Sequence, residues 1–385
     1  MRKLGWLTKY GVASITASLL FISGAAQAAD ALEVRIPVQV FADVGAFSRT
    51  AGAASTSSAV SATIPERNGA FVGSLTLFAS PQLGDHVRSL FELVSEYNAS
   101  GTNVITVERA QIGYVFNDAA TVWGGRFHSP YGYWNTAYHH GAQLQPSIAR
   151  PVQLSGALPA HTVGLWVTGQ FNAGSGKLTY DVYGGNSTRV MGAPSGSIDP
   201  NHTSGDNKNK NLGFNVGYNW GGAMDGLRTG VHAMAAKVTE CTNALADSCT
   251  TAITRSRMKM SGVYAHYENY NVELIAEYYR FKNTNLLSAA NQDYEAKSSS
   301  GFVQLGYVLA AWTPFVRYEE TDYDPKDEFF KTLSNGKNYS KSIAGVRYEL
   351  NSNAVLKAEF AQIKSRTAPS LEDSQDFRVQ YAIRF

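Results

Sequence analysis

The last nine residues of the chain alternate strictly between two kinds of side chain. They read Phe-Arg-Val-Gln-Tyr-Ala-Ile-Arg-Phe over residues 377–385. A repeat of two residues places one set on each face of a β-strand. The apolar or aromatic set is Phe377, Val379, Tyr381, Ile383 and Phe385. The other face is largely polar, so this strand would separate an apolar environment from a polar one.

The same alternation recurs along the chain in segments of about ten residues, the length of a tilted strand that crosses a membrane. Sixteen segments are predicted as strands: 33–48, 67–79, 87–97, 104–116, 120–127, 160–171, 176–186, 210–220, 226–238, 255–268, 271–283, 294–309, 312–323, 338–350, 354–366 and 376–385. The connections between them alternate between short turns and mostly longer loops. This pattern predicts an all-β fold, a transmembrane antiparallel β-barrel of about sixteen strands, give or take two, over residues 29–385.

Composition excludes two other classes of protein. Mean hydropathy is −0.20, too polar for a bundle of membrane helices, each of which needs about 20 consecutive apolar residues. Apolar residues make up 44% of the chain and aromatic residues 12%, too many for a chain that stays unfolded. A soluble β-domain remains the alternative, but it would not explain 21 tyrosines and 35 glycines as readily as aromatic girdles and narrow lumen positions do.

The first 28 residues have the features of a cleaved secretory signal peptide. A basic start with Arg2, Lys3 and Lys9 precedes a mostly apolar run and an Ala26-Gln27-Ala28 cleavage motif. The rest of the chain then carries 30 Lys and Arg against 31 Asp and Glu. Net charge therefore gives no indication of nucleic-acid binding, and none is expected.

The C-terminal alternation resembles the β-signal of bacterial outer-membrane proteins, which ends in Phe and is recognised by the barrel-assembly machinery. That resemblance implies a multi-pass barrel in the outer membrane of a Gram-negative bacterium, in contact with outer-membrane lipid.

The longest connection, residues 128–159, follows the fifth predicted strand. A loop this long is uncommon unless it is functional. Its aromatic side chains need a surface to pack on, and the barrel wall would provide one if the loop folded inward. It is also the third long loop, and in general porins the third extracellular loop folds inward and narrows the pore.

Charge around this loop is one-sided, because residues 119–180 contain no Asp or Glu. A constriction lined by cations favours anions, although an acid-free window can also arise by chance. We expect the pore constriction to include Arg126, His128, Tyr131, Trp134, His139, His140 and Arg150. A metal site is the alternative interpretation of the three histidines, but we expect none, because adjacent residues on an extended chain point apart and no carboxylate lies nearby in the sequence. No cofactor is expected.

The only two cysteines, Cys241 and Cys249, both fall in one predicted loop. Export through an oxidising compartment favours a disulfide between them. A metal site is again the alternative, and no neighbouring histidine supports it.

Strand alternation also predicts which cations face the lumen. If Ile112 and Tyr381 face lipid, the intervening polar residues face inward. The lumen-facing candidates are Arg109, Lys259, Arg317, Arg347, Arg378 and Arg384. Carboxylates such as Glu92, Glu277, Glu319 and Glu359 would lie among them, so ion pairs that stiffen the wall are at least as plausible as contacts with a solute.

Residues 125–132, Gly-Arg-Phe-His-Ser-Pro-Tyr-Gly, resemble the G-x-F-x-x-P-x-G element of the phosphate-selective porin superfamily. The resemblance implies a sixteen-stranded, usually trimeric outer-membrane channel. The dense basic ladder that carries phosphate selectivity is not apparent here, so passive diffusion of small hydrophilic solutes, particularly anions, carries over better than phosphate as the substrate. A loop-based receptor or adhesin is the alternative, favoured by an acidic run at residues 319–324. A barrel hydrolase is less well supported, since no G-x-S-x-G motif presents a nucleophile, and we expect no enzyme activity.

Overall fold

The computed structural model of the chain describes most of the region after residue 32. The described residues are 33–50, 67–97, 103–139, 141–151, 154, 158–186, 189–191, 197–199, 210–241, 252–286, 292–333, 338–366 and 373–385. The predicted signal peptide, His140 and Cys249 lie outside these residues, as does the side chain of Cys241, so those predictions remain untested.

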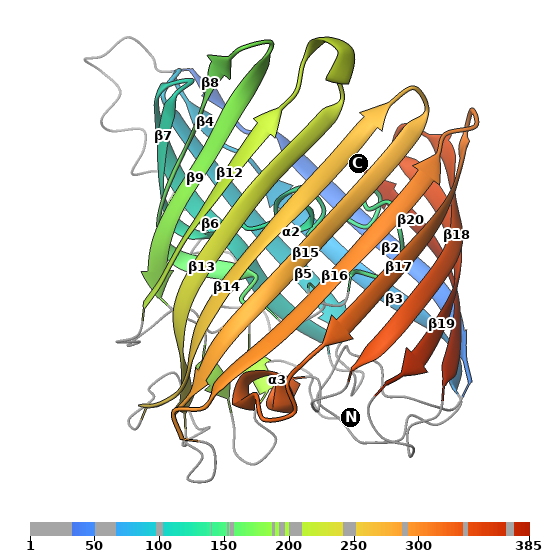
Figure 1. Cartoon of the computed structure of the whole chain (residues 1–385). Helices are drawn as coiled ribbons and strands as arrows, with labels where there is room; N and C mark the ends of the chain where they lie inside the picture. The colour runs from blue at the N-terminus through green and yellow to red at the C-terminus, as the bar shows by residue number, and fades with distance from the viewer. Residues whose placement is uncertain are drawn as a thin grey trace, which may run out of the picture.

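Sixteen antiparallel strands form a closed barrel (Figure 1). Closure is achieved because β2 pairs with β20 as well as with β3. The barrel strands are β2 (Val38–Arg49), β3 (Arg67–Ala79), β5 (Val87–Tyr97), β6 (Asn103–Asn117), β7 (Ala120–His128), β8 (His161–Ala173), β9 (Gly176–Asn186), β12 (Lys210–Asn219), β13 (Leu227–Cys241), β14 (Ala252–Asn269), β15 (Val272–Asn285), β16 (Glu295–Tyr307), β17 (Trp312–Asp322), β18 (Tyr339–Asn351), β19 (Ala354–Ser365) and β20 (Ser374–Arg384). Each of the sixteen predicted segments corresponds to one of them, which confirms the predicted fold class.

The remaining elements are short. Four strands of two or three residues extend the sheet: β1 (Val34–Arg35), β4 (Gln82–Leu83), β10 (Arg189–Met191) and β11 (Ser197–Asp199). The helical elements are α2 (Trp134–Ala137), the 3-10 turn η2 (Gly222–Met224) and α3 (Glu328–Leu333). Among the described residues, none of the helices is long and apolar enough to span a membrane.

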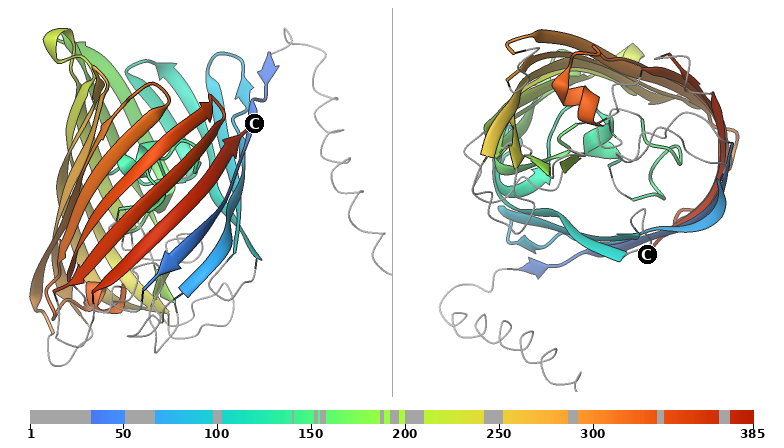
Figure 2. Two further views of the ribbon diagram at one scale, coloured as in Figure 1. Left: turned by 90° about the vertical axis from the view of Figure 1, so that its right-hand side faces the viewer. Right: turned by 90° about the horizontal axis from the view of Figure 1, so that it is seen from below.

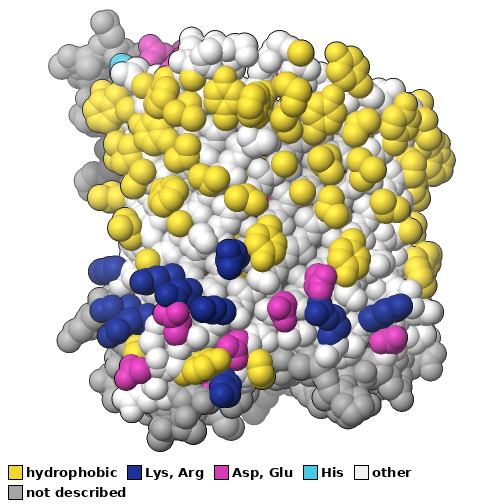
Figure 3. Space-filling model, viewed as in Figure 1, with side chains coloured by type: hydrophobic (Ala, Val, Ile, Leu, Met, Phe, Trp, Pro, Cys, Tyr) yellow, Lys and Arg dark blue, Asp and Glu magenta, His cyan; other side chains and the backbone are white. Residues whose placement is uncertain are grey.

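The outer wall carries the apolar side of the alternation. Ile112, Leu165 and Val316 are each more than half exposed, whereas the alternate residues Gln111 and Arg317 are buried. Figure 3 shows hydrophobic side chains over most of one outer face and a belt of charged side chains towards the end that carries α3. An apolar band around a closed barrel is the surface that a hydrocarbon layer would cover.

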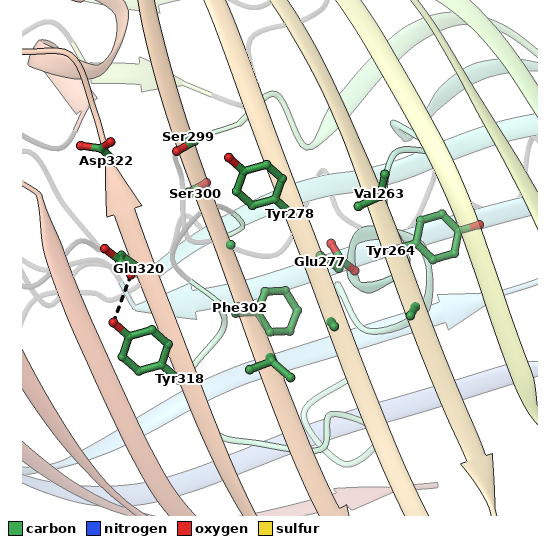
Figure 4. A pocket seen from close by; sticks show the side chains of 14 residues that line it. Val263, Tyr264, Glu277, Tyr278, Ser299, Ser300, Phe302, Tyr318, Glu320 and Asp322 are labelled. Carbon is green, nitrogen blue, oxygen red and sulfur yellow. Dashed lines mark hydrogen bonds between the residues drawn. The ribbon is translucent and has the colours of Figure 1, made fainter.

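Strands β14 to β17 show the same division at close range (Figure 4). A groove of about 590 Å³ lies against them, and exposed Val263, Tyr278 and Tyr318 contribute to its lining. Tyr318 Oη donates a hydrogen bond to Glu320 Oε2 at 3.1 Å. Because its exposed lining belongs to the outer wall, we exclude this groove from the channel interior.

The segment between β7 and β8 lies inside the barrel, with α2 enclosed by the wall in a view along the barrel axis (Figure 2). Its Tyr131, Trp134 and Leu158 join wall residues such as Tyr279 in the largest buried apolar cluster. Phe329 and Phe330 of α3 belong to the same cluster. The described residues of the predicted loop 128–159 thus lie inside the barrel, and much of the interior is packed.

Packing inside the barrel explains one wrong prediction, the inward orientation of Lys259. Met258 and Met260 are 1% and 2% exposed and occupy the inner face, so Lys259 faces outward, opposite the exposed Lys282 of β15. The prediction assumed that apolar side chains on this strand face lipid. Here the inner face meets the packed interior, and the basic residues point outward near the loop end of the wall.

The prediction that Arg126 belongs to the pore constriction is also wrong. Arg126 of β7 pairs with Val163 of β8. Gly124, two residues away on the same face of β7, pairs with Leu165, which is 65% exposed on the outer wall. The neighbouring Phe127 is fully buried and faces inward. Paired residues of antiparallel strands point to the same face, so Arg126 lies on the outer side, where its Nε donates to the carbonyl oxygen of Glu108 at 3.0 Å.

Candidate functional site

The candidate functional site is the inward-folded segment together with the part of the wall that it leaves uncovered. The segment turns into the lumen at Gly132, which has φ +64°. A Cβ atom there would lie 2.6 Å from Glu277 Oε2, so only glycine combines this backbone conformation with so close an approach to the wall.

Glu277 of β15 holds the start of α2. Its Oε1 accepts hydrogen bonds from the backbone amides of Tyr133 and Trp134 at 2.9 and 2.6 Å. Tyr279 donates its hydroxyl to the other carboxylate oxygen. Glu277 is 3% exposed, so these bonds satisfy a charge that would otherwise be buried without partners.

Glu359 of β19 repeats this arrangement at the far side of the segment. Its two carboxylate oxygens accept from the amides of Ile148 and Ala149, both at 2.9 Å. Strands β15 and β19 are separated by three others, so the segment is attached at two well-separated places on the wall.

Three cations bind the carbonyl and hydroxyl oxygens of the same segment. Arg317 donates to Ser147 Oγ and to the carbonyl of Ala149, both at 2.8 Å. Arg347 donates to the carbonyls of Gln143 and Gln145 at 2.6 and 3.0 Å, and Lys357 Nζ to that of Ala142 at 2.5 Å. Arg317 and Arg347 thus face inward as predicted, but they anchor the loop.

Residues 119–180 contain no Asp or Glu, but carboxylates from other strands bring negative charge to this part of the barrel. Glu277 of β15 and Glu359 of β19 bind the inward-folded segment. Glu319 is fully buried, and its carboxylate lies 3.0 Å from Lys341 Nζ. The burial of Glu319 also removes it from the acidic rim on which the receptor alternative relied. The segment itself contains no Asp or Glu, and burial raises the pKa of Tyr131 and Tyr138. Arg150 is half-buried next to the anchored Ala149.

An interior cavity of about 380 Å³ remains between this segment and the wall near β3 to β8. Thr136 of α2 lines one side, and Gln111, Trp123 and Trp166 line the wall. Among the described residues that line it, Arg88 and Arg109 are the permanently charged ones. Arg109 Nε contacts Glu92 Oε2 at 2.6 Å, which holds one guanidinium in place.

Further cations follow along the adjoining strands. Arg49 and Arg378 both contact Asp376 Oδ2, at 2.7 and 2.6 Å. Arg384 lies near the turn that joins β18 to β19, where it donates to the carbonyl of Ser352 at 3.3 Å. Arg109 and Arg378 are thus placed inward by their contacts with Glu92 and Asp376, and Asp43 of β2 is a further buried carboxylate on these strands.

Two of the three predicted histidines, His128 and His139, lie close together, and the third, His140, lies outside the described residues. His128 and His139 lie with ring centroids 4.3 Å apart, next to His161 of β8. Sequence analysis missed His161 and Glu108 as members of this cluster. A register shift opposite Glu92 turns both Glu108 and Arg109 inward, and no sequence pattern marks that irregularity.

The exposed face of β20 carries the predicted assembly signal. Phe377, Val379, Tyr381 and Phe385 are exposed on the outer wall, and Ile383 is partly exposed. Phe385 exchanges backbone hydrogen bonds with Val40 of β2 at 2.9 and 3.1 Å. The C-terminal strand therefore closes the barrel, while recognition by assembly machinery stays a prediction.

Several solved structures share this architecture at low sequence identity. An anion-selective porin from Comamonas acidovorans is 14% identical, with a TM-score of 0.58 over 92% of this chain and 100% of its own. The outer-membrane channel DcaP of Acinetobacter baumannii is 12% identical, with a TM-score of 0.58 over 91% and 97%. The trimer form of OmpT, an outer membrane protein of Vibrio cholerae, is 13% identical, with a TM-score of 0.52 over 91% and 99%.

No protein-family model matches the chain, and no curated protein matches its sequence. At these identities the structural similarity establishes the fold and leaves the function to be argued from the site.

Proposed function

We propose that the chain is an outer-membrane channel through which small hydrophilic solutes diffuse passively. The observation that carries the proposal is a closed barrel with an apolar outer wall, an inner wall rich in charged groups, and a segment anchored across its interior at Glu277 and Glu359. Such a barrel would need lipid outside and water inside. A fixed segment in the lumen would set the width of the path.

Anions are the favoured solutes in this proposal. The interior cavity is lined by Arg88 and Arg109, and Arg49 and Arg378 stand on neighbouring strands. Cations along a narrow path lower the barrier for anions and raise it for cations. One solved structure with the same fold is described as an anion-selective porin, which is consistent with this preference.

The resemblance of residues 125–132 to phosphate-selective porins supports the same class of solute without identifying phosphate. A trimer is proposed on that resemblance, and the trimer form of a similar barrel is consistent with it. Export by a cleaved signal peptide of residues 1–28 and assembly through the β20 signal complete the proposal.

Swelling of proteoliposomes tests the channel directly. Liposomes containing the folded protein should swell in isotonic solutions of small sugars, at rates that fall with sugar size. Anionic amino acids should enter faster than cationic ones of similar size. Swelling no faster than that of liposomes carrying heat-unfolded protein would refute the channel.

A further inference from the structure

Four potential metal ligands converge beside the interior cavity. They are Glu108 of β6, His128 at the end of β7, His139 after α2, and His161 at the start of β8. All four are buried, and one ligand atom from each lies within 4.8 Å of the others.

We propose that these four residues form a binding site for a divalent transition metal ion, with Zn²⁺ as the best match. Three imidazoles and one carboxylate supply the nitrogen and oxygen ligands that zinc accepts in four-coordinate sites. Bond lengths of 2.0–2.2 Å in a tetrahedron require neighbouring ligand atoms about 3.3–3.6 Å apart. His161 Nε2 and Glu108 Oε2 are 2.6 Å apart and would have to separate by about 0.7 Å, while ligand atoms that now lie up to 4.8 Å apart would move closer.

The hydrogen bonds of Asn135 orient His139 for this role. Asn135 Nδ2 donates to the carbonyls of Ser129 and Ala160 at 2.8 and 3.2 Å, which identifies Oδ1 as the acceptor facing His139 Nδ1 at 2.8 Å. Nδ1 of His139 therefore carries the proton, which leaves the lone pair on Nε2, the nitrogen that would ligate a metal ion. A second partner that fixes the tautomer of a ligating histidine is typical of metal sites.

The electrostatic environment suits one divalent cation. The site contributes one carboxylate and three imidazoles, and the adjacent Glu92, 4.0 Å from His128, is already bound to Arg109. A bound ion would also have a route in, because His128 lines the 380 Å³ interior cavity.

The site would fasten the constriction segment to the wall near both of its ends. His128 and His139 belong to its first part, His161 directly follows it, and Glu108 comes from the neighbouring strand. With all four positions filled by protein, the ion would be structural, with no open position for chemistry.

Metal titration of the untagged, detergent-folded full chain tests the proposal independently of conduction. After treatment with a chelator, wild type should take up one equivalent of Zn²⁺ at micromolar free metal. X-ray absorption at the zinc edge should show four nitrogen and oxygen ligands, with imidazole scattering. An absence of stoichiometric uptake, or a six-coordinate shell of oxygen alone, would overturn the site.

Two variants separate the cluster from adventitious binding by histidine. His139→Ala should weaken Zn²⁺ binding at least about 100-fold, the upper range for losing only a supporting hydrogen bond. His86→Ala changes an exposed ring stacked on Tyr114 at a short turn and should bind like wild type. Equal affinity of His139→Ala and wild type would refute the assignment. If His139→Ala does not fold, the ligand shell of wild type still decides the question.

Discussion

Replacement of Glu359 by Gln tests whether carboxylates of the barrel wall hold the inward-folded segment in place. Glu359 is 2% exposed and accepts from two backbone amides at 2.9 Å. Gln keeps the shape but offers one acceptor oxygen and turns an NH₂ group towards the other amide. One amide of Ile148 or Ala149 is then left without an acceptor in a buried place.

The size of the effect follows from these two bonds. A buried N–H group that loses its acceptor costs about 1–3 kcal/mol, and replacing a charged acceptor by a neutral one removes about 1 kcal/mol from the other bond. The docked state of residues 141–151 should therefore lose about 2–4 kcal/mol. At about 1.4 kcal/mol per factor of ten, the local opening equilibrium rises roughly 30- to 700-fold.

Hydrogen exchange of the amides of Ile148 and Ala149 measures that opening, and single-channel recording should show more open-channel noise. Asp43→Asn is the matched control, because Asp43 is a buried inward carboxylate whose hydrogen-bond partners Ser74 and Gln380 belong to the wall. Unchanged protection in Glu359→Gln, or an equal loss of protection in the control, would show that Glu359 does not anchor the segment.

Three further predictions concern charge, pH and the two cysteines. Arg88→Glu should move ion selectivity towards cations, because Arg88 lines the interior cavity. Lys259→Glu should leave the reversal potential unchanged, because Lys259 faces outward. Equal shifts of the reversal potential in both variants would contradict the assigned orientations. Burial raises the pKa of Asp327, although Ser298, Asn283 and the amide of Phe329 donate to it. The pKa of Asp327 is higher in the folded protein than in the unfolded chain, so docking of α3 should strengthen as pH falls through the folded pKa. Hydrogen exchange of the α3 amides, corrected for the intrinsic exchange rate, should therefore slow at lower pH. Asp327→Asn should abolish this pH dependence. Reduction and alkylation should add mass at Cys241 and Cys249 only after reduction if the predicted disulfide exists.

Strand alternation was sufficient to predict the barrel because each wall residue faces either the apolar outer surface or the interior. The sixteen segments and the inward orientation of Arg317, Arg347 and Arg378 follow from that repeat. It fails at Lys259, because Met258 and Met260 face a packed interior. An alternating strand alone does not reveal whether its inner face meets water or another apolar segment.

The inward-folded loop could be predicted from its length and aromatic content, but its anchors could not. Glu277 and Glu359 lie 144 and 211 residues from the amides that they bind, and nothing in the local sequence links them. The convergence of Glu108 with three histidines depends on an irregular register in β6. Such irregularities arise from tertiary packing and leave little trace in a single sequence.

Recording of single channels in planar lipid bilayers tests the central claim most directly. The purified, folded protein should insert with discrete conductance steps. Under a salt gradient, its reversal potential should have the sign of anion preference. Conductance steps with cation preference would refute the role assigned to the arginines, and folded protein that produces no steps would contradict the channel itself.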